Sequence, residues 1–174
     1  MVKKRYFKKS IKSAVTKAIG KYHRTKMNYV MDIYFDGQGN VKYDGDNNGF
    51  SIGDVLTGNT SEFQKLGKQY SMVKLRGILI ETDSPGNPQG YNFTLGVVQS
   101  NDSPTYNNLI TQPNVMIMPT TTTGRMYVPI GGQFTPTNDI QLFSNMKLLA
   151  VANGTPNGRF TVKITLYLTF KSIL

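Results

Sequence analysis

Residues 158–174 read GRFTVKITLYLTFKSIL, and apolar side chains alternate with polar ones through most of this segment. The apolar positions are Phe160, Val162, Ile164, Leu166, Leu168 and Phe170. The polar positions between them are Thr161, Lys163, Thr165, Tyr167, Thr169 and Lys171. Because successive side chains of a β-strand point to opposite faces, this alternation predicts a long strand with one face in the core and the other in water.

Further segments with strand character lie upstream. They are 27–35, 70–83, 92–99, 114–118, 124–130 and 146–154. Clusters of Gly, Pro, Asn and Thr separate them, and we expect 146–154 to form a hairpin with the C-terminal strand across NGTPNG (153–158). A short helix is expected at 61–70, and little helix after it. About eight strands joined by turns rather than by helices predict an all-β antiparallel fold, meaning a sandwich, a jelly roll or a barrel.

The 174-residue chain has no cysteine, so disulfides, thiolate nucleophiles and cysteine-type zinc sites are excluded. No apolar run approaches 18 residues, which predicts that there is no transmembrane helix and no membrane partner. The N-terminus lacks the apolar segment of a signal peptide. We therefore expect a soluble protein of a reducing compartment, with one domain at 27–174.

Positive charge is concentrated before residue 27. Of the 20 Lys and Arg residues, ten lie in 1–26, a segment without any acid, whereas 27–174 carries ten basic and ten acidic residues. The basic positions of this N-terminal arm are Lys3, Lys4, Arg5, Lys8, Lys9, Lys12, Lys17, Lys21, Arg24 and Lys26. Like charges repel one another and oppose compact packing, so such a block is typical of a segment that binds a polyanion.

The arm also has an apolar stripe with helical spacing. Its members are Ile11, Ala14, Val15, Ala18, Ile19 and Tyr22. Ser10 is suited to begin an amphipathic helix there and Gly20 to end it. The sequence therefore predicts a basic, partly helical N-terminal arm.

Nucleic acid is the polyanion that the arm fits best. Lysine and arginine displace counterions from phosphates, while Tyr6, Phe7 and Tyr22 offer rings on which unpaired bases can stack. Lysine outnumbers arginine eight to two, which favours contacts indifferent to base sequence. Lys163, with Lys171, is a candidate auxiliary phosphate contact on the polar face of the last strand. The alternative interpretations of the arm are a solvated tail and a nuclear-import signal.

Residues 49–53, GFSIG, match the G-x-S-x-G pattern of a serine hydrolase, with Ser51 as the nucleophile. The base would have to be His23, the only histidine, which precedes Ser51 and lies in the basic arm. Asp32 and Asp36 fall on the polar side of a strand, where a solvated carboxylate is the usual state. A Gly-rich loop is the better interpretation, and we expect no catalytic activity and no cofactor.

Residues 44–49, DGDNNG, match the first half of a calcium loop through Asp44, Asp46 and Asn48. The last ligand position holds Val55 instead of glutamate. Since Asp, Asn and Gly are also the ordinary residues of a tight turn, we favour a turn and keep a weak calcium site as the alternative.

A segment before the long strand at 70–83 is similar to one in a known family. SEFQKLGKQYSMVKLRGILIE (61–81) resembles a helix-to-strand segment in capsid proteins of small circular single-stranded DNA viruses, the circovirus-like group. The matching positions are Phe63, Leu66, Tyr70, Val73, Lys74, Leu75, Gly77 and Ile78. The T-x-Y-x-T-F-K ending at 165–171 fits as well. The layout of a basic arm followed by an all-β body is also similar to that of satellite plant-virus coat proteins.

The resemblance implies a single eight-stranded jelly roll, with about 60 copies in a T=1 icosahedral shell and the arm directed inward. Roughly 600 positive charges would then face a genome of about one to two thousand phosphates. The partners would be further copies of the chain and the viral genome, and the location the virion, with the host nucleus during assembly. The host receptor stays open. The alternative is a cellular nucleic-acid-binding β-domain with a basic tail.

Overall fold

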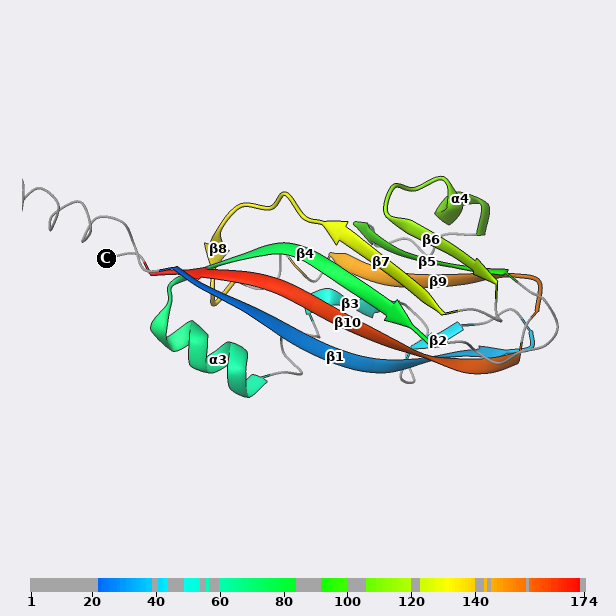
Figure 1. Cartoon of the computed structure of the whole chain (residues 1–174), viewed down its shortest axis with the longest axis horizontal. Coiled ribbons are helices and arrows are strands. Elements are labelled where there is room, and N and C mark those ends of the chain that lie inside the picture. Colours follow the sequence, from blue (N-terminus) through cyan, green and yellow to red (C-terminus); the bar gives the residue numbers. More distant parts are fainter. Residues whose placement is uncertain are drawn as a thin grey trace, which may run out of the picture.

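Two antiparallel β-sheets face each other in the computed structural model of the chain (Figure 1). The structure describes residues 22–38, 41–43, 49–53, 56, 60–83, 92–99, 106–119, 123–139, 143, 145–155 and 157–172. One sheet has the strand order β2-β1-β10-β4-β7, with β8 also paired to β4. The other has the order β3-β9-β5-β6.

The strands of the six-stranded sheet are β1 (Tyr22–Asp36), β2 (Val41–Tyr43), β4 (Met72–Thr82), β7 (Gly124–Pro129), β8 (Thr135–Pro136) and β10 (Asn157–Lys171). Those of the four-stranded sheet are β3 (Phe50–Ser51), β5 (Asn92–Gln99), β6 (Val115–Pro119) and β9 (Met146–Asn153). The helices are α3 (Thr60–Gln69) and α4 (Tyr106–Ile110). Within the described ranges, neither helix has the length and apolar composition needed to cross a membrane.

The path of the chain between the sheets is that of a jelly roll. If the short β2 and β8 are left aside, consecutive strands alternate between the two sheets, with one exception. Only β5 and β6 follow each other within the same sheet, where they pair. All strand pairs are antiparallel. The predicted all-β antiparallel jelly roll is therefore confirmed, with two short strands added to the eight.

The predicted hairpin between 146–154 and 158–174 is wrong. β9 pairs with β3 and β5, and β10 pairs with β1 and β4, so the two consecutive strands lie in different sheets. Gly154 has a positive φ of 102° at this connection. A Gly- and Asn-rich turn signal shows that the chain changes direction, but it does not distinguish pairing in one sheet from a crossing of the roughly 10 Å between two sheets.

β10 is a central strand of the six-stranded sheet and supplies one side of the core. It pairs with β1 along its whole length, from Tyr22↔Lys171 to Asp36↔Asn157, and with β4 on its other edge. All six of its predicted apolar positions are fully buried. Phe160 packs on Phe93 of the opposite sheet with ring centroids 4.5 Å apart.

The opposite side of β10, predicted to be wet, is wet only in part. Lys163 is exposed, whereas Thr165 and Thr169 are buried. A strand with neighbours on both edges has its short polar side chains covered by longer ones from the flanking strands.

The first strand begins at Tyr22, five residues before the predicted start at Met27. The pairing with β10 extends through Arg24 and Lys26, and Tyr22, predicted as the last member of a helical stripe, lies in a strand. At the inward positions of this extension stand His23, which stacks on Tyr70, and Thr25, which donates a hydrogen bond to Glu62. These inward residues are polar, so hydrophobic alternation did not reveal this end of the strand.

A buried tyrosine joins the two sheets. The Tyr43 hydroxyl of β2 donates to the Ala150 carbonyl at 3.2 Å and accepts from the Ala150 N–H at 2.6 Å. β3 is only two residues long and pairs with β9 no further than Leu148, so Tyr43 takes the place of a strand partner at Ala150. Burial raises the pKa of Tyr43 to about 12, and the hydrogen bond to Ala150 opposes this shift.

Leu166→Ala tests the core face of β10. Leu166 is fully buried at the centre of the strand, and its truncation leaves a cavity, so we expect the free energy of unfolding to fall by about 2–5 kcal/mol in urea denaturation. Val30→Ala is the control, because Val30 is 59% exposed on β1. This substitution should lower the free energy of unfolding by less than about 0.5 kcal/mol. Equal stability of the two variants would contradict the assigned faces.

Tyr43→Phe tests the bridge between the sheets. The substitution leaves the buried N–H and C=O of Ala150 without this partner, so we expect a loss of about 1–3 kcal/mol at neutral pH. The folded pKa of Tyr43 is raised, so its stabilisation is complete below the unfolded pKa of about 10 and is lost as pH rises toward 12. The stability difference between the parent and Tyr43→Phe should therefore shrink by about 1 kcal/mol between about pH 9 and pH 11. A difference independent of pH would contradict the buried, protonated hydroxyl.

Candidate nucleic-acid interface

Many of the predicted site residues lie outside the described residues. For nucleic-acid binding these are Lys3, Lys4, Arg5, Tyr6, Phe7, Lys8, Lys9, Lys12, Lys17 and Lys21, and for calcium they are Asp44, Asp46 and Asn48. Their roles stay predictions. The predicted binding residues that the structure does place are Tyr22, Arg24, Lys26 and Lys163.

These four residues share one face of the six-stranded sheet, the face turned away from the core, which we call the outer face. Tyr22, Arg24 and Lys26 alternate with inward-facing residues in β1, and they pair in register with Lys171, Thr169 and Tyr167 of β10. Residues directly opposite one another in an antiparallel pair point to the same side of the sheet. The first residue pairs of the β1–β10 ladder therefore place positive and aromatic side chains at one end of the outer face.

Further cations join this end from other strands. Lys74 of β4 pairs with Thr169, and Arg76 lies beside it in the β-bulge where the β4–β10 register shifts. We call the set Arg24, Lys26, Lys74, Arg76 and Lys171 the basic end. Arg24 and Lys26 are exposed, and the other three are half-buried. Among the described residues, no carboxylate forms an ion pair with any member of the basic end.

Acidic residues gather at the opposite end of the same face. Glu81 lies 3.5 Å from Arg125 and 3.7 Å from Lys163, and Asp32 lies 3.4 Å from Arg159. We call these five residues the paired end. A hydrogen bond with Tyr34 and the nearby Asp32 carboxylate raise the pKa of Arg159 above its ordinary value. Lys163 thus has a carboxylate partner, whereas the described part of the chain gives none to the cations of the basic end.

Aromatic rings lie among the cations of the basic end. The Lys26 Nζ stands 5.1 Å from the centroid of the Tyr167 ring, and the Lys171 Nζ stands 5.9 Å from the Tyr22 ring. Lys74 and Arg76 were not predicted as binding residues from the sequence, which gave 70–83 only as a long strand. Their outward positions are visible in the sequence only once the register with Thr169 is known.

The structure does not bring the predicted serine and histidine together. Ser51 lies in the four-stranded sheet, and its Oγ accepts a hydrogen bond from the Gly53 N–H at 3.2 Å. The neighbouring Phe50 stacks on Tyr29, which is six residues along β1 from His23, or roughly 20 Å of extended strand. Asp32 is engaged by Thr161 and Arg159. In the described part of the chain, no three His, Cys, Asp or Glu side chains cluster as a metal site requires.

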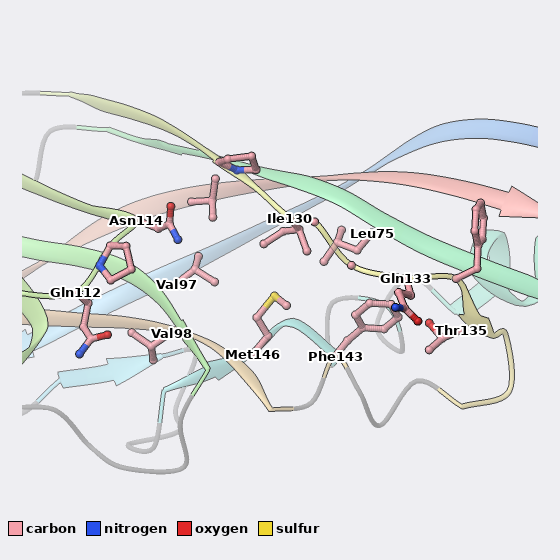
Figure 2. Close-up of a pocket in the computed structure, with 16 residues that line it drawn as sticks. Leu75, Val97, Val98, Gln112, Asn114, Ile130, Gln133, Thr135, Phe143 and Met146 are labelled. Atoms are coloured by element: carbon pink, nitrogen blue, oxygen red, sulfur yellow. The ribbon is translucent and has the colours of Figure 1, made fainter.

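A cavity of about 910 Å³ opens between the two sheets beside β7 and the segment that follows it. Figure 2 shows Val97, Ile130 and Met146 pointing into this space. The described residues of its lining are apolar or amide and include no acid, base or histidine, and the one hydroxyl among them, that of Thr135, donates to the Val73 carbonyl. This described part of the lining therefore offers a hydrophobic surface without ionisable groups.

Neither a protein-family model nor a curated protein sequence matches the chain. Solved structures with a similar fold do exist. The chain aligns with the cocksfoot mottle virus structure at a TM-score of 0.61 and 7% identity, over 88% of this chain and 85% of the other. It aligns with the capsid protein of BFDV, solved as a 60-mer, at a TM-score of 0.55 and 12% identity, over 88% and 95%.

The likeness extends to other viruses. The virus-like particle of the nodavirus of the giant freshwater prawn Macrobrachium rosenbergii aligns at a TM-score of 0.53 and 9% identity, over 88% of this chain and 96% of the other. The similarity therefore covers nearly the whole body and includes circovirus, nodavirus and plant-virus structures. What this chain shares with these viral capsid proteins is the two-sheet jelly-roll fold.

Proposed function

We propose that the chain is a viral capsid protein that assembles into a small icosahedral shell and packages a nucleic-acid genome. The observation that carries the proposal is the likeness of fold to structures that include a 60-mer capsid protein and a T=1 subviral particle. A closed shell of about 60 copies satisfies repeated contacts between identical subunits. The chain's role is then structural, with a location in the virion.

The distribution of charge supports the packaging role. The formal net charge of +10 arises before residue 27, because the rest of the chain has ten basic and ten acidic residues. We assign packaging to residues 1–26, whose last five residues are the beginning of β1, and the shell to 27–174. Lysine-rich contacts neutralise phosphates without reading base sequence.

Single-stranded DNA is the proposed genome, with assembly in the host nucleus. The support is the 61–81 segment and its similarity to circovirus-like capsid proteins. The alternative is a cellular nucleic-acid-binding β-domain with a basic tail, which would be a monomer or a small oligomer.

Particle size distinguishes the two proposals. The purified chain of 19.4 kDa should form particles of about 1.2 MDa, visible as uniform shells by electron microscopy. Nuclease digestion followed by extraction then identifies the cargo, and we expect DNA resistant to RNase. A species that elutes as a monomer at every concentration would rule out the capsid proposal.

Charge removal tests the arm. The six-fold variant with Lys3, Lys4, Lys8, Lys9, Lys12 and Lys17 all changed to Gln keeps the apolar stripe, and we expect shells that are empty or assemble poorly, with subunit folding unchanged. The slope of log affinity for single-stranded oligonucleotides against log salt should become shallower by about 4, since it tracks the phosphates neutralised.

The control uses charges of the body. Changing the exposed Lys42, Lys65 and Lys68 to Gln removes as much charge as a three-fold arm variant at Lys3, Lys4 and Lys8. Only the arm variant should lower the nucleic-acid content of the shells. Equal cargo in parent and arm-variant shells at the same salt would contradict packaging by the arm.

A further inference from the structure

Charge on the outer face of the six-stranded sheet is separated along the strands. All three ion pairs of the described residues lie at the paired end, where Asp32 and Glu81 neutralise their neighbours. The Glu62 carboxylate accepts a hydrogen bond from Thr25, which lies on the other face of β1. A folded surface with five cations and no acid of its own repels itself, so its stability gains from a bound polyanion.

The basic end is narrow and ordered by strand register. Arg24, Thr169 and Lys74 form one row across β1, β10 and β4, and Lys26 and Tyr167 form the next row. With strands about 4.8 Å apart and residues about 3.3 Å apart, the five cations fit within roughly 10 by 13 Å. This is the scale of a few consecutive nucleotides, not of a protein partner, whose interface is several times larger.

Three threonines on the outer face follow one another along β10, and only the first two have a hydrogen-bond acceptor opposite them on β1. On β10 the Thr161 hydroxyl donates to Asp32 of β1 at 2.9 Å, and the Thr165 hydroxyl donates to Asn28 at 2.8 Å. The third member, Thr169, has Arg24 in the corresponding position.

The third threonine therefore lacks an acceptor. Arginine and lysine side chains have only donors, and among the described residues the buried Thr169 Oγ1 has no hydrogen-bond partner, nor has the buried Nε of Arg76. A phosphate that parted the flexible Arg24 and Lys74 side chains would supply the missing oxygens.

Aromatic rings lie beside and next to these cations on the outer face. Tyr22 is 53% exposed and Tyr127 is 52% exposed, while Tyr167 lies between them and meets Tyr127 edge to face at 5.7 Å. Gly77 leaves room for the Tyr127 ring in this arrangement, because a Cβ at position 77 would collide with it. Flat rings beside cations are the surface on which unpaired bases stack.

We infer that the basic end binds single-stranded nucleic acid, with phosphates held by the five cations over Thr169 and bases stacked on Tyr22, Tyr127 and Tyr167. This inference deepens the proposed function, since it adds to the arm a second contact surface, on the folded body. Duplex nucleic acid fits less well, because its bases are already stacked on one another and its rings cannot cover the tyrosines.

The first experiment measures binding of the full chain, at concentrations too low for assembly, to fluorescein-labelled dT20 and U20 by anisotropy. The basic-end variant carries Lys26→Gln, Lys74→Gln and Lys171→Gln. The matched control carries Lys42→Gln, Arg125→Gln and Arg159→Gln, which removes the same charge from the same face, far from the basic end. We expect only the basic-end variant to make the slope of log affinity against log salt shallower by about 2. Equal effects of both variants would overturn the inference, since net charge alone would then explain binding.

The second experiment tests the rings. Tyr22→Leu and Tyr127→Leu should each weaken dT20 binding about tenfold, and Tyr34→Leu, an exposed tyrosine near the paired end, should leave it unchanged. Photocrosslinking of a bromodeoxyuridine oligonucleotide, read by mass spectrometry, should label peptides that contain Tyr22 or Tyr127. Labelling confined to residues 1–21, or losses equally large for a duplex of the same length, would overturn the inference. Melting curves confirm that each variant is folded.

The two proposals fail separately. If the arm variant empties the shells but the basic-end variant binds oligonucleotides like the parent, the capsid proposal stands and this inference is wrong. If no shells form but the basic end is crosslinked, the inference stands without the capsid. A basic-end variant that binds normally but no longer assembles would show a protein interface instead, which also overturns the inference. Equal affinity for dT20 and U20 supports recognition of backbone and rings, and a preference supports it while showing that the sugar or the thymine methyl group contributes to binding.

Discussion

The pairing of β10 with β1 and β4 is the constraint on which the rest of the structure depends. β10 has neighbours on both edges, and its side chains alternate between the core and the outer face, so its register fixes both faces at once. A slip of one residue would turn Leu166 and its apolar neighbours outward and bury Lys163 and Lys171. The core and the charge pattern of the outer face are therefore two sides of one arrangement. The β-bulge at Tyr167/Leu168 adjusts β4 to this register without disturbing the β1 side.

The long strands could be predicted from the sequence because the apolar and polar residues of each strand alternate, and this alternation shows which face is buried. The alternation of β10 and of β1 from Met27 onward predicts strands, and α3 follows from SEFQKLGKQY. Pairing is a different kind of information, because it depends on which strands meet in space. For that reason the β9–β10 hairpin was wrong, and the first residues of β1, whose inward positions His23 and Thr25 are polar, were assigned to the arm.

The candidate site was predicted only in part, because it too depends on which strands pair in space. Counting charges along the chain identifies the arm, including Arg24 and Lys26, because its basic residues lie close together in the sequence. The basic end combines residues from β1, β4 and β10, and it becomes visible only when Arg24, Thr169 and Lys74 are known to share a row. The partner of Lys163, Glu81, is likewise 82 positions away in sequence. A positive residue in a sequence says little about its availability until its neighbours across the sheet are known.

The antiparallel pairing of β1 with β10 has a mechanical consequence. Its fifteen register pairs begin at Tyr22↔Lys171, so the strand ends at residues 22 and 171 lie next to each other. A force that pulls these two ends apart acts across the ladder and not along it, and its hydrogen bonds would break one after another, as in a zipper. Tension on the arm from a nucleic acid held elsewhere would thus fall first on the pairs nearest Tyr22. The jelly roll would yield gradually from this end, while the Phe35, Phe93 and Phe160 cluster at the far end of the ladder stays closed.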